Sequence, residues 1–293
     1  MVSLKSMSRT MPPSHQLSGQ PNPDTVLYHA DCADGFGAAW ALWKRFSGAQ
    51  YIPVMHGCDP PGGLEGRQVI MVDFSYPREV IERMAMSTGS LLVLDHHVTA
   101  QANLQGLPYA YFDMKKSGAV LAWEWAHQEP VPWLLQYIQD KDLWEWRLPH
   151  SREINAALAS YPFEFEAWDA LRQDTLEIEG RAILRFEKTL VEKIVNEAVL
   201  VSFEGETVPA VYSPVMTSQI GERLCQGFPF CIIWHEQDGR RYFSLRSRAG
   251  AVDVSAIAAR NGGGGHVNAA GFSIPLVSHE TGPLNPLKGL TLP

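Results

Sequence analysis

Short apolar runs alternate with segments of helical periodicity between residues 24 and about 114. This alternation is typical of a parallel sheet covered by helices. The pattern predicts strands at residues 25–29, 51–54, 68–73, 90–95 and 109–112, with helices at 36–46 and 76–87. We therefore expect an α/β domain over residues 24–160.

Helical spacing dominates from residue 117 to about 198, and the charged stretch 164–198 suits a helical connector. Beyond it the pattern predicts strands at 208–212, 230–235 and 241–245, with helices near 218–226 and 253–259. We expect a connector over residues 161–198 and a smaller α+β domain over 199–277. Residues 1–23 are predicted to be a disordered tail, in which Met7 and Met11 are alternative starts, and residues 278–293 an irregular one.

Acidic and imidazole side chains follow three of the predicted strands. They are His29, Asp31 and Asp34 in VLYHADCAD, Asp73 in VIMVDF, and Asp95, His96 and His97 in LLVLDHH. Ligands of open parallel sheets bind at the carboxyl ends of the strands, so we expect these side chains to meet. Crowded carboxylates are costly unless cations neutralise them. Mixed carboxylate and imidazole ligation suits Mn²⁺ best, with Mg²⁺, Co²⁺ or Fe²⁺ as alternatives, and a pair of such cations can catalyse phosphoryl transfer.

Other chemistries lack their motifs. There is no GxSxG, GxxxxGK[ST] or HExxH sequence. Cys32 lies beside the acidic residues, whose charge raises a thiol pKa and disfavours a nucleophilic role. The four cysteines form no CxxC pair, which predicts neither a disulfide framework nor a structural zinc site and favours a reduced, cytoplasmic protein.

A glycine tract marks the second predicted domain. RNGGGGHVNAAGF (260–272) holds four consecutive glycines, which fit neither a helix nor a strand interior but allow backbone N–H groups to converge on an anion. Five arginines fall between residues 240 and 260 against one acid, Asp253: Arg240, Arg241, Arg246, Arg248 and Arg260. A phosphate-binding end is the prediction; a flexible linker and an ordinary solvated arginine face are the alternatives.

Net charge and hydropathy exclude two partner classes. The formal charge is −8, whereas binding of long duplex nucleic acid needs an extended basic surface. No apolar stretch approaches the roughly 20 residues of a membrane span. Small anionic substrates remain compatible with both observations.

These motifs carry a resemblance to a known family. HADCADG, VDF, LDHH and DKDLW resemble motifs I to IV of the DHH phosphoesterase superfamily, and SLRSR (244–248) with GGGGHVNAAGF resembles its DHHA1 accessory domain. The resemblance covers roughly residues 24–274. It implies an N-terminal parallel-sheet DHH domain and a smaller C-terminal DHHA1-like domain. Relatives include nanoRNase-type oligoribonucleases, pAp phosphatases, cyclic-dinucleotide phosphodiesterases and RecJ-like exonucleases.

The resemblance also implies roles for single residues. One cation would be held by His29, Asp31 and Asp73, and the other by Asp34, Asp73, His96 and Asp142. His97 would face the scissile phosphate, with Asp95 orienting the histidines. Substrate binding would fall to Arg246, Ser247, Gly262, Gly263, Gly264, Gly265 and His266, across a cleft from the metal cluster.

Two positions depart from the family pattern. Motif I often reads Asp-x-Asp, whereas Asp31 and Asp34 are three residues apart. Motif IV offers both Asp140 and Asp142, of which Asp142, in DLW, matches the shorter oligoribonuclease-like members. Five tryptophans nearby, Trp123, Trp125, Trp133, Trp144 and Trp146, favour core packing over base stacking for most of them.

The predicted function is hydrolysis of phosphoester bonds in short oligonucleotides by water activated with two divalent cations. The alternatives are a phosphatase or phosphodiesterase for a small nucleotide, such as pAp or a cyclic or linear dinucleotide, and a non-catalytic nucleotide-binding module. The complete set of ligands disfavours that module. A homodimer is a further possibility, and no membrane partner is expected.

Overall fold

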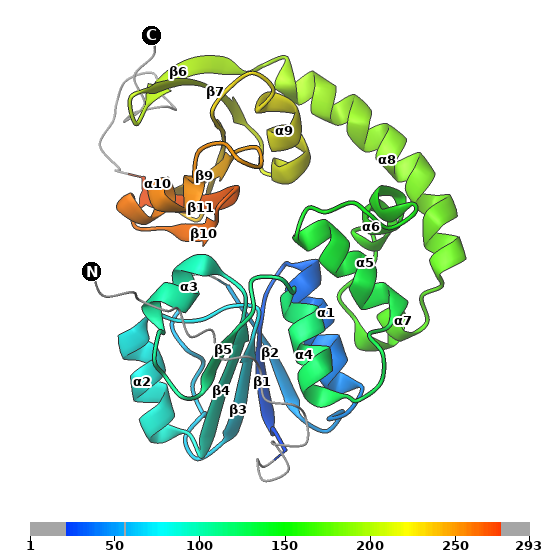
Figure 1. The fold of residues 1–293 in the computed structure, drawn as a ribbon, viewed down its shortest axis with the longest axis vertical. Coiled ribbons are helices and arrows are strands. Elements are labelled where there is room, and N and C mark those ends of the chain that lie inside the picture. The colour runs from blue at the N-terminus through cyan, green and yellow to red at the C-terminus, as the bar shows by residue number, and fades with distance from the viewer. Residues whose placement is uncertain (1–21, 56, 277–293) are drawn as a thin grey trace, which may run out of the picture. The chain divides into compact units, whose positions relative to one another are not determined.

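The computed structural model describes residues 22–55 and 57–276. Of the predicted tails, residues 1–21 of the N-terminal one (1–23) and all of the C-terminal one (278–293) lie outside this range. The chain forms two compact units that divide after Leu184, and each has its own sheet (Figure 1). Among the described residues, no helix combines the length and apolarity needed to cross a bilayer.

The first unit is built on a five-stranded parallel sheet with the order β2-β1-β3-β4-β5. Its strands are β1 (Thr25–His29), β2 (Gln50–Val54), β3 (Gln68–Val72), β4 (Ser90–Asp95) and β5 (Ala110–Phe112). Successive side chains of a strand point to opposite faces, so apolar strands need cover on both. Val26 and Ile70 pack in one hydrophobic cluster, while Leu27 and Met71 pack in another. The predicted α/β architecture is confirmed.

Helices cover the two faces of this sheet (Figure 1). The cluster that contains Val26 includes residues of α1 (Ala33–Trp43), α4 (Gly118–Ala126), α5 (Trp133–Asp142) and α6 (Ser151–Leu158). The cluster that contains Leu27 includes residues of α2 (Arg78–Ser87). A short helix, α3 (Val98–Asn103), follows β4.

The stretch 164–198, which the sequence predicts as a helical connector, contains two helices, α7 (Phe165–Asp169) and α8 (Gln173–Val195). Trp168 of α7 is only 1% exposed and packs edge-on against Phe36 of α1, with ring centroids 4.7 Å apart. Burial of so large an apolar ring against the first unit fixes the direction of α7. The chain therefore turns before α8 begins.

The second unit is α+β, as predicted. Its six-stranded sheet has the order β10-β11-β9-β8-β7-β6, and its neighbours are antiparallel except β7 and β8. The elements are β6 (Val199–Phe203), β7 (Glu206–Tyr212), α9 (Thr217–Leu224), β8 (Cys231–Gln237), β9 (Arg240–Arg246), α10 (Val254–Arg260), β10 (Gly264–His266) and β11 (Ala269–Pro275). The hydrophobic pattern did not predict β6, β10 or β11.

The glycine tract corrects an expectation from the sequence. Gly264 and Gly265 lie in the short strand β10 and pair with β11, although four glycines seemed incompatible with a strand. A Cβ at Gly263 would stand 2.0 Å from the carbonyl oxygen of Gly271, and one at Gly265 would stand 2.6 Å from that of Ala269. Glycine therefore allows β11 to approach this closely.

Candidate active site

The side chains predicted at the strand ends meet in one buried cluster of the first unit. His96, which follows β4, lies at its centre, with Nε2 3.0 Å from Asp73 Oδ1, 3.4 Å from Asp34 Oδ2 and 3.6 Å from Asp142 Oδ2. Asp34, Asp73 and His96 are each at most 2% exposed. Three carboxylates therefore surround one imidazole, and two of them, Asp34 and Asp73, are shielded from water, whereas the Asp142 side chain is 22% exposed.

The Asp73 carboxylate is positioned by the end of a sheet strand. Asp73 directly follows β3, and its backbone N–H donates to the carbonyl of Leu94 on the neighbouring strand at 3.0 Å. Its φ of 62° is in the left-handed region, which Asp tolerates better than most residues. The chain thus turns sharply at the strand end and holds the Asp73 carboxylate beside His96.

Asp34 is held by the start of helix α4. Its carboxylate accepts hydrogen bonds from the backbone N–H groups of Gly118 (2.6 Å) and Ala119 (3.0 Å). The first turn of a helix favours an anion, because its N–H groups have no partner within the helix. The α4 terminus therefore stabilises a carboxylate that would otherwise be buried at high cost.

Gly118 is a site residue that sequence reasoning missed. A Cβ at this position would stand 2.6 Å from Asp73 Cβ and 3.0 Å from Asp34 Oδ2. Only glycine lets α4 approach both carboxylates. The available signal was Ser117, an N-cap residue whose hydroxyl accepts from the N–H of Val120, followed directly by glycine.

The two acidic residues of motif IV have different surroundings. Asp142 reaches the cluster through its contact with His96. Asp140 is 4% exposed and accepts hydrogen bonds from the backbone N–H groups of Arg147 (2.8 Å) and Leu148 (3.2 Å). Asp140 therefore organises the loop after α5, and only Asp142 contacts His96.

Asp95 and His97 form a second pair. Asp95 is fully buried, and its Oδ1 lies 2.7 Å from Nδ1 of His97 while accepting the backbone N–H groups of His96 and His97. Burial opposes a charge on His97, but the Asp95 carboxylate outweighs it and raises the pKa of His97. Asp95 thus fixes the orientation of the ring and favours its protonated form.

His29 approaches the cluster from the end of β1, with Nδ1 3.5 Å from Asp73 Oδ2. Ligand atoms of His29, Cys32 and Asp73 lie within 4.8 Å of one another. Asp31 is exposed, with a φ of 53°, and belongs to none of the candidate metal-binding groups among the described residues. The structure therefore brings together every predicted metal ligand except Asp31.

The electrostatics of the cluster reflect its burial. Burial and the charges of Asp73 and Asp142 raise the pKa of Asp34 well above its usual range. Burial opposes protonation of His96, but the hydrogen bond to Asp73 and the charges of Asp142, Asp73 and Asp34 raise its pKa to about 10. Without a metal ion, a protonated His96 ring thus faces three acidic groups.

The donor set fits divalent cations. The Oδ2 atoms of Asp73 and Asp142 are buried and have no hydrogen-bond partner among the described residues. Buried carboxylate oxygens of this kind are normally paired or coordinate metals. Oxygen and imidazole donors together suit Mn²⁺, Fe²⁺ or Co²⁺.

The predicted substrate residues of the second unit lie at the end of β9, directly after it, on β10 and in the turn between α10 and β10. Arg246 donates to the carbonyl of Leu245 and to the hydroxyls of Thr217 and Ser218, and its Nε is buried with no hydrogen-bond partner among the described residues. Ser247 accepts a hydrogen bond from the side-chain amide of Asn268. Gly262 and Gly263 lie in the turn, while Gly264, Gly265 and His266 form β10.

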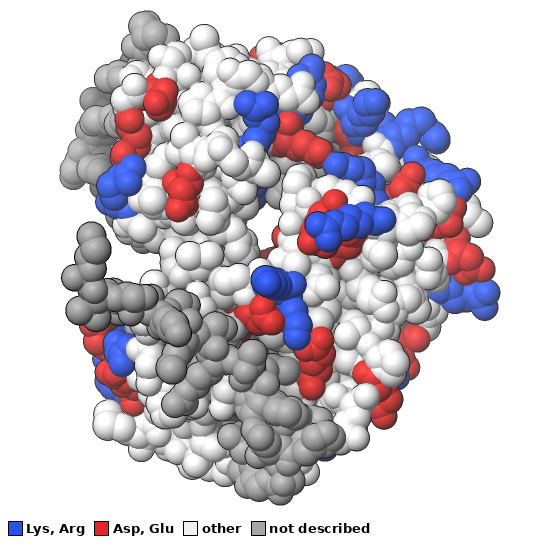
Figure 2. All heavy atoms as spheres, viewed as in Figure 1, with Lys and Arg blue, Asp and Glu red and all other residues white. Residues whose placement is uncertain are grey.

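Three of the five arginines at the predicted basic end of the second unit bind polar side chains of the same unit. Arg240 hydrogen-bonds Ser273, Arg241 pairs with Glu236, and Arg260 pairs with Glu204. Among the described residues, Arg246 and Arg248 form no ion pair with an acidic side chain. On the face shown in Figure 2, basic and acidic side chains are interspersed along α8 and form no continuous basic track.

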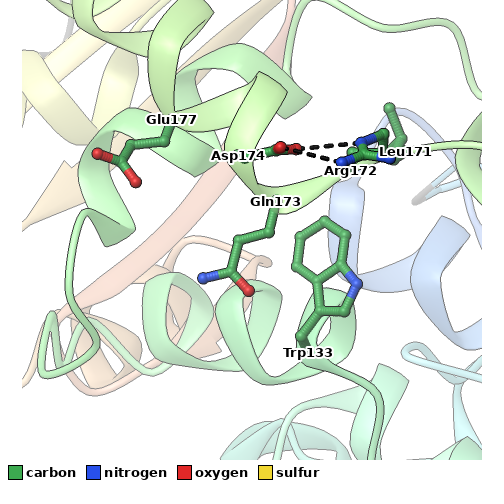
Figure 3. Close-up of a pocket in the computed structure, with 6 residues that line it drawn as sticks. All are labelled: Trp133, Leu171, Arg172, Gln173, Asp174 and Glu177. Atoms are coloured by element: carbon green, nitrogen blue, oxygen red, sulfur yellow. Dashed lines mark hydrogen bonds and ion pairs between the residues drawn. The ribbon is translucent and has the colours of Figure 1, made fainter.

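A surface pocket of the first unit is separate from the cluster. It lies between the start of α5 and the first turns of α8, where Arg172 pairs with Asp174 beside Trp133 (Figure 3). None of its lining residues contributes to the strand-end cluster. We therefore assign it no part in the chemistry.

The tryptophans near motif IV divide by exposure. Trp123 and Trp125 are buried, as predicted for core residues, whereas Trp144 is 39% exposed. Trp144 and Trp146 both have positive φ values, 57° and 54°, which are unusual for bulky side chains. Their rings pack edge-on with centroids 5.0 Å apart. An exposed aromatic surface thus begins two residues after Asp142 in the chain.

The chain was compared with known proteins. No family model matches the sequence. The chain is 31% identical to the uncharacterized protein R106 of Acanthamoeba polyphaga mimivirus over 296 residues, which cover 89% of this chain and 70% of the viral protein. The pGpG-specific phosphodiesterase PggH of Vibrio cholerae is 14% identical, with a TM-score of 0.47, over 86% of this chain and 93% of that one. RecJ of Thermus thermophilus, in complex with Mn²⁺, is 16% identical, with a TM-score of 0.47, over 90% of this chain and 52% of that one.

The parallel sheet and the buried Asp/His cluster at its strand ends have the arrangement that the resemblance of the four motifs to DHH phosphoesterases implies. The chain belongs to the same family as protein R106.

Proposed function

We propose that this protein hydrolyses phosphoester bonds of short oligonucleotides, using divalent cations held by its strand-end cluster. One observation carries the proposal. Three carboxylates, one directly after β3, one from α1 and one from α5, converge on His96, and two of their oxygens are buried without a hydrogen bond among the described residues. An arrangement of this kind is costly in a metal-free structural role and useful in a metal site.

The residues of the cluster would bind the cations at two positions. His29, Asp34, Asp73, His96 and Asp142 would hold the cations, with Asp73 between the two positions because it contacts both His29 and His96. Two divalent cations at this place would activate a water molecule and stabilise charge on the attacking and leaving oxygens.

His97 would interact with the substrate phosphate. Asp95 accepts from its Nδ1 and favours the protonated ring, so His97 would present a positive charge to a phosphate oxygen. The same pair keeps the ring from rotating, which preserves its alignment. We expect the second unit, through Arg246, Ser247, His266 and the glycines at 262–265, to hold another part of the substrate.

Two observations support a nucleotide substrate of small size. The exposed ring of Trp144, two residues after Asp142, offers a face on which a base can stack, with a gain of about 1–3 kcal/mol. The formal charge of −8 and the interspersed charges on the face shown in Figure 2 do not favour the extended basic surface that a long strand needs. A phosphatase or phosphodiesterase for a small nucleotide is the second candidate, since the same features suit it.

A substrate panel tests the proposal and separates the two candidates. Purified protein with Mn²⁺ is assayed on RNA and DNA of two to five nucleotides, on strands of about 20 nucleotides, on pAp, on cyclic dinucleotides and on pyrophosphate. We expect the short oligonucleotides to have the highest kcat/KM. The Asp73→Ala variant serves as the inactive control. Equal turnover by Asp73→Ala, or no turnover of any substrate by wild-type protein, contradicts the proposal.

A further inference from the structure

Cys32 is the residue that the predicted ligand set leaves out. It directly follows Asp31 in motif I, and its sulfur lies with a nitrogen of His29 and a carboxylate oxygen of Asp73 in a group whose members are all within 4.8 Å of one another. Metal–ligand bonds to nitrogen, oxygen and sulfur span about 2.0–2.3 Å, so small side-chain adjustments bring all three atoms to one ion.

The local backbone explains why Cys32, and not Asp31, belongs to this group. Asp31 has a φ of 53° and is exposed to solvent. Cys32 is the N-cap residue of α1, a position where Ser, Thr, Asp and Asn are preferred because their side chains cap the helix. The Cys32 side chain makes no cap hydrogen bond. A residue that contributes little to helix capping thus occupies this position beside the acidic cluster.

A second observation points to a ligand at this place. Asp73 Oδ2 is buried, belongs to a side chain only 2% exposed and has no hydrogen-bond partner among the described residues. It lies 3.5 Å from His29 Nδ1, beyond a good hydrogen bond. A cation between this oxygen, the His29 ring and the sulfur would satisfy the Asp73 oxygen.

We propose that Cys32 is a thiolate ligand of the first cation position, which it shares with His29 and Asp73 in the place expected of Asp31. The inference rests on the proposed metal-dependent function. On binding, the S–H proton leaves to solvent and a sulfur lone pair forms the metal–sulfur bond. Because thiolates prefer softer cations, this position selects Zn²⁺, Co²⁺ or Fe²⁺ over Mg²⁺ and Ca²⁺.

Cobalt spectroscopy tests the proposal independently of turnover. Metal-free protein is titrated with Co²⁺, and the near-ultraviolet thiolate-to-cobalt absorption and the bound metal per chain are recorded. Wild-type protein is expected to show the absorption and bind two equivalents. Cys32→Ser is expected to lose the absorption and retain one equivalent at the position of Asp34, His96 and Asp142.

Two matched variants complete the design. Cys58→Ser removes an exposed cysteine and is expected to behave as wild type. Asp31→Ala is expected to retain both equivalents and the full absorption. Persistence of the absorption in Cys32→Ser overturns the inference, because it assigns the sulfur to Cys58 or to the buried pair Cys225 and Cys231. Loss of one equivalent in Asp31→Ala, with none lost in Cys32→Ser, overturns it as well.

The proposed function fails separately from this inference. If wild-type protein binds no cation, or if cation binding supports no phosphoester hydrolysis, the proposed function itself is contradicted. Two bound equivalents and active protein without a thiolate absorption leave the function intact and remove only the role of Cys32.

Discussion

Substitution of Gly118 by alanine tests whether the start of helix α4 shapes the metal site. The added Cβ would stand 2.6 Å from Asp73 Cβ, whereas carbon atoms pack best about 3.5–4.0 Å apart. Asp73, α4 or both must therefore move by about 1 Å. Overpacking of this kind costs about 1–3 kcal/mol, partly offset by the better helix propensity of alanine, up to about 1 kcal/mol.

The expected effect on activity is larger than the effect on stability. A displacement of about 1 Å at a catalytic group can lower the rate on the order of 10²-fold. The same movement lengthens the hydrogen bonds from Gly118 and Ala119 to Asp34. We expect Gly118→Ala to lose about 100-fold in kcat/KM and part of its bound metal, while the free energy of unfolding falls by about 2 kcal/mol or less.

Three measurements and one control decide the result. Metal content after gel filtration, kcat/KM at saturating metal and urea unfolding are compared with those of Gly37→Ala. A Cβ at Gly37 would stand 3.1 Å from Ala119 Cβ and Ile138 Cδ1, so it crowds the neighbouring apolar interface without touching an acidic residue. Wild-type metal content and activity in Gly118→Ala, or an equally steep loss of activity in Gly37→Ala, would refute the reasoning.

Three further predictions follow from the cluster. Asp142→Ala should lose metal and activity with little loss of stability. Asp140→Ala leaves two backbone N–H groups without their acceptor, so it should lose roughly 2–3 kcal/mol of stability and keep its metal. Metal analysis and urea unfolding distinguish the two variants, and the reverse pattern would exchange the two roles. A strong chelator should abolish hydrolysis, and Mn²⁺ should restore it better than Ca²⁺, because imidazole ligands disfavour a cation that prefers oxygen; undiminished turnover by metal-free protein contradicts this. In metal-free protein the raised pKa of His96, about 10 against 6.5 in an unfolded chain, stabilises the fold fully below about pH 6.5, and this stabilisation is lost as the pH rises through about 10. Urea unfolding over that range should show the decline, His96→Gln should flatten it, and a stability that rises with pH would reverse the assigned sign.

The positions of the strand-end residues could be predicted from sequence because two simple rules combine. Apolar runs of strand length fix where the strands end, and parallel connection places those ends at one edge of the sheet. His29 ends its strand, and Asp73 and His96 each follow a strand directly, so their convergence depends on few local details. The same rules give no information on which residues of a turn point inward.

The positions of Gly118 and Cys32 beside the cluster could not be predicted from the sequence. The role of Gly118 depends on how closely α4 approaches Asp34 and Asp73, which are distant in the chain, and no local pattern encodes that distance. Asp31 and Cys32 are adjacent, and the left-handed backbone at Asp31 decides which side chain joins the cluster. At motif IV, Asp140 and Asp142 differ by about 200° around α5, so helical geometry directs the two side chains differently.

If the cluster binds cations as proposed, the amount of folded protein depends on metal supply. Asp34, Asp73, His96 and Asp142 come from four separate segments of the chain, so an unfolded chain cannot present them together. A cation that binds only the folded form stabilises it by about 2.7 kcal/mol when its free concentration is about 100 times its dissociation constant. Under metal starvation that stabilisation is withdrawn, and a larger fraction of the chains becomes accessible to cellular proteases. The abundance of this protein would then follow metal availability even at constant synthesis.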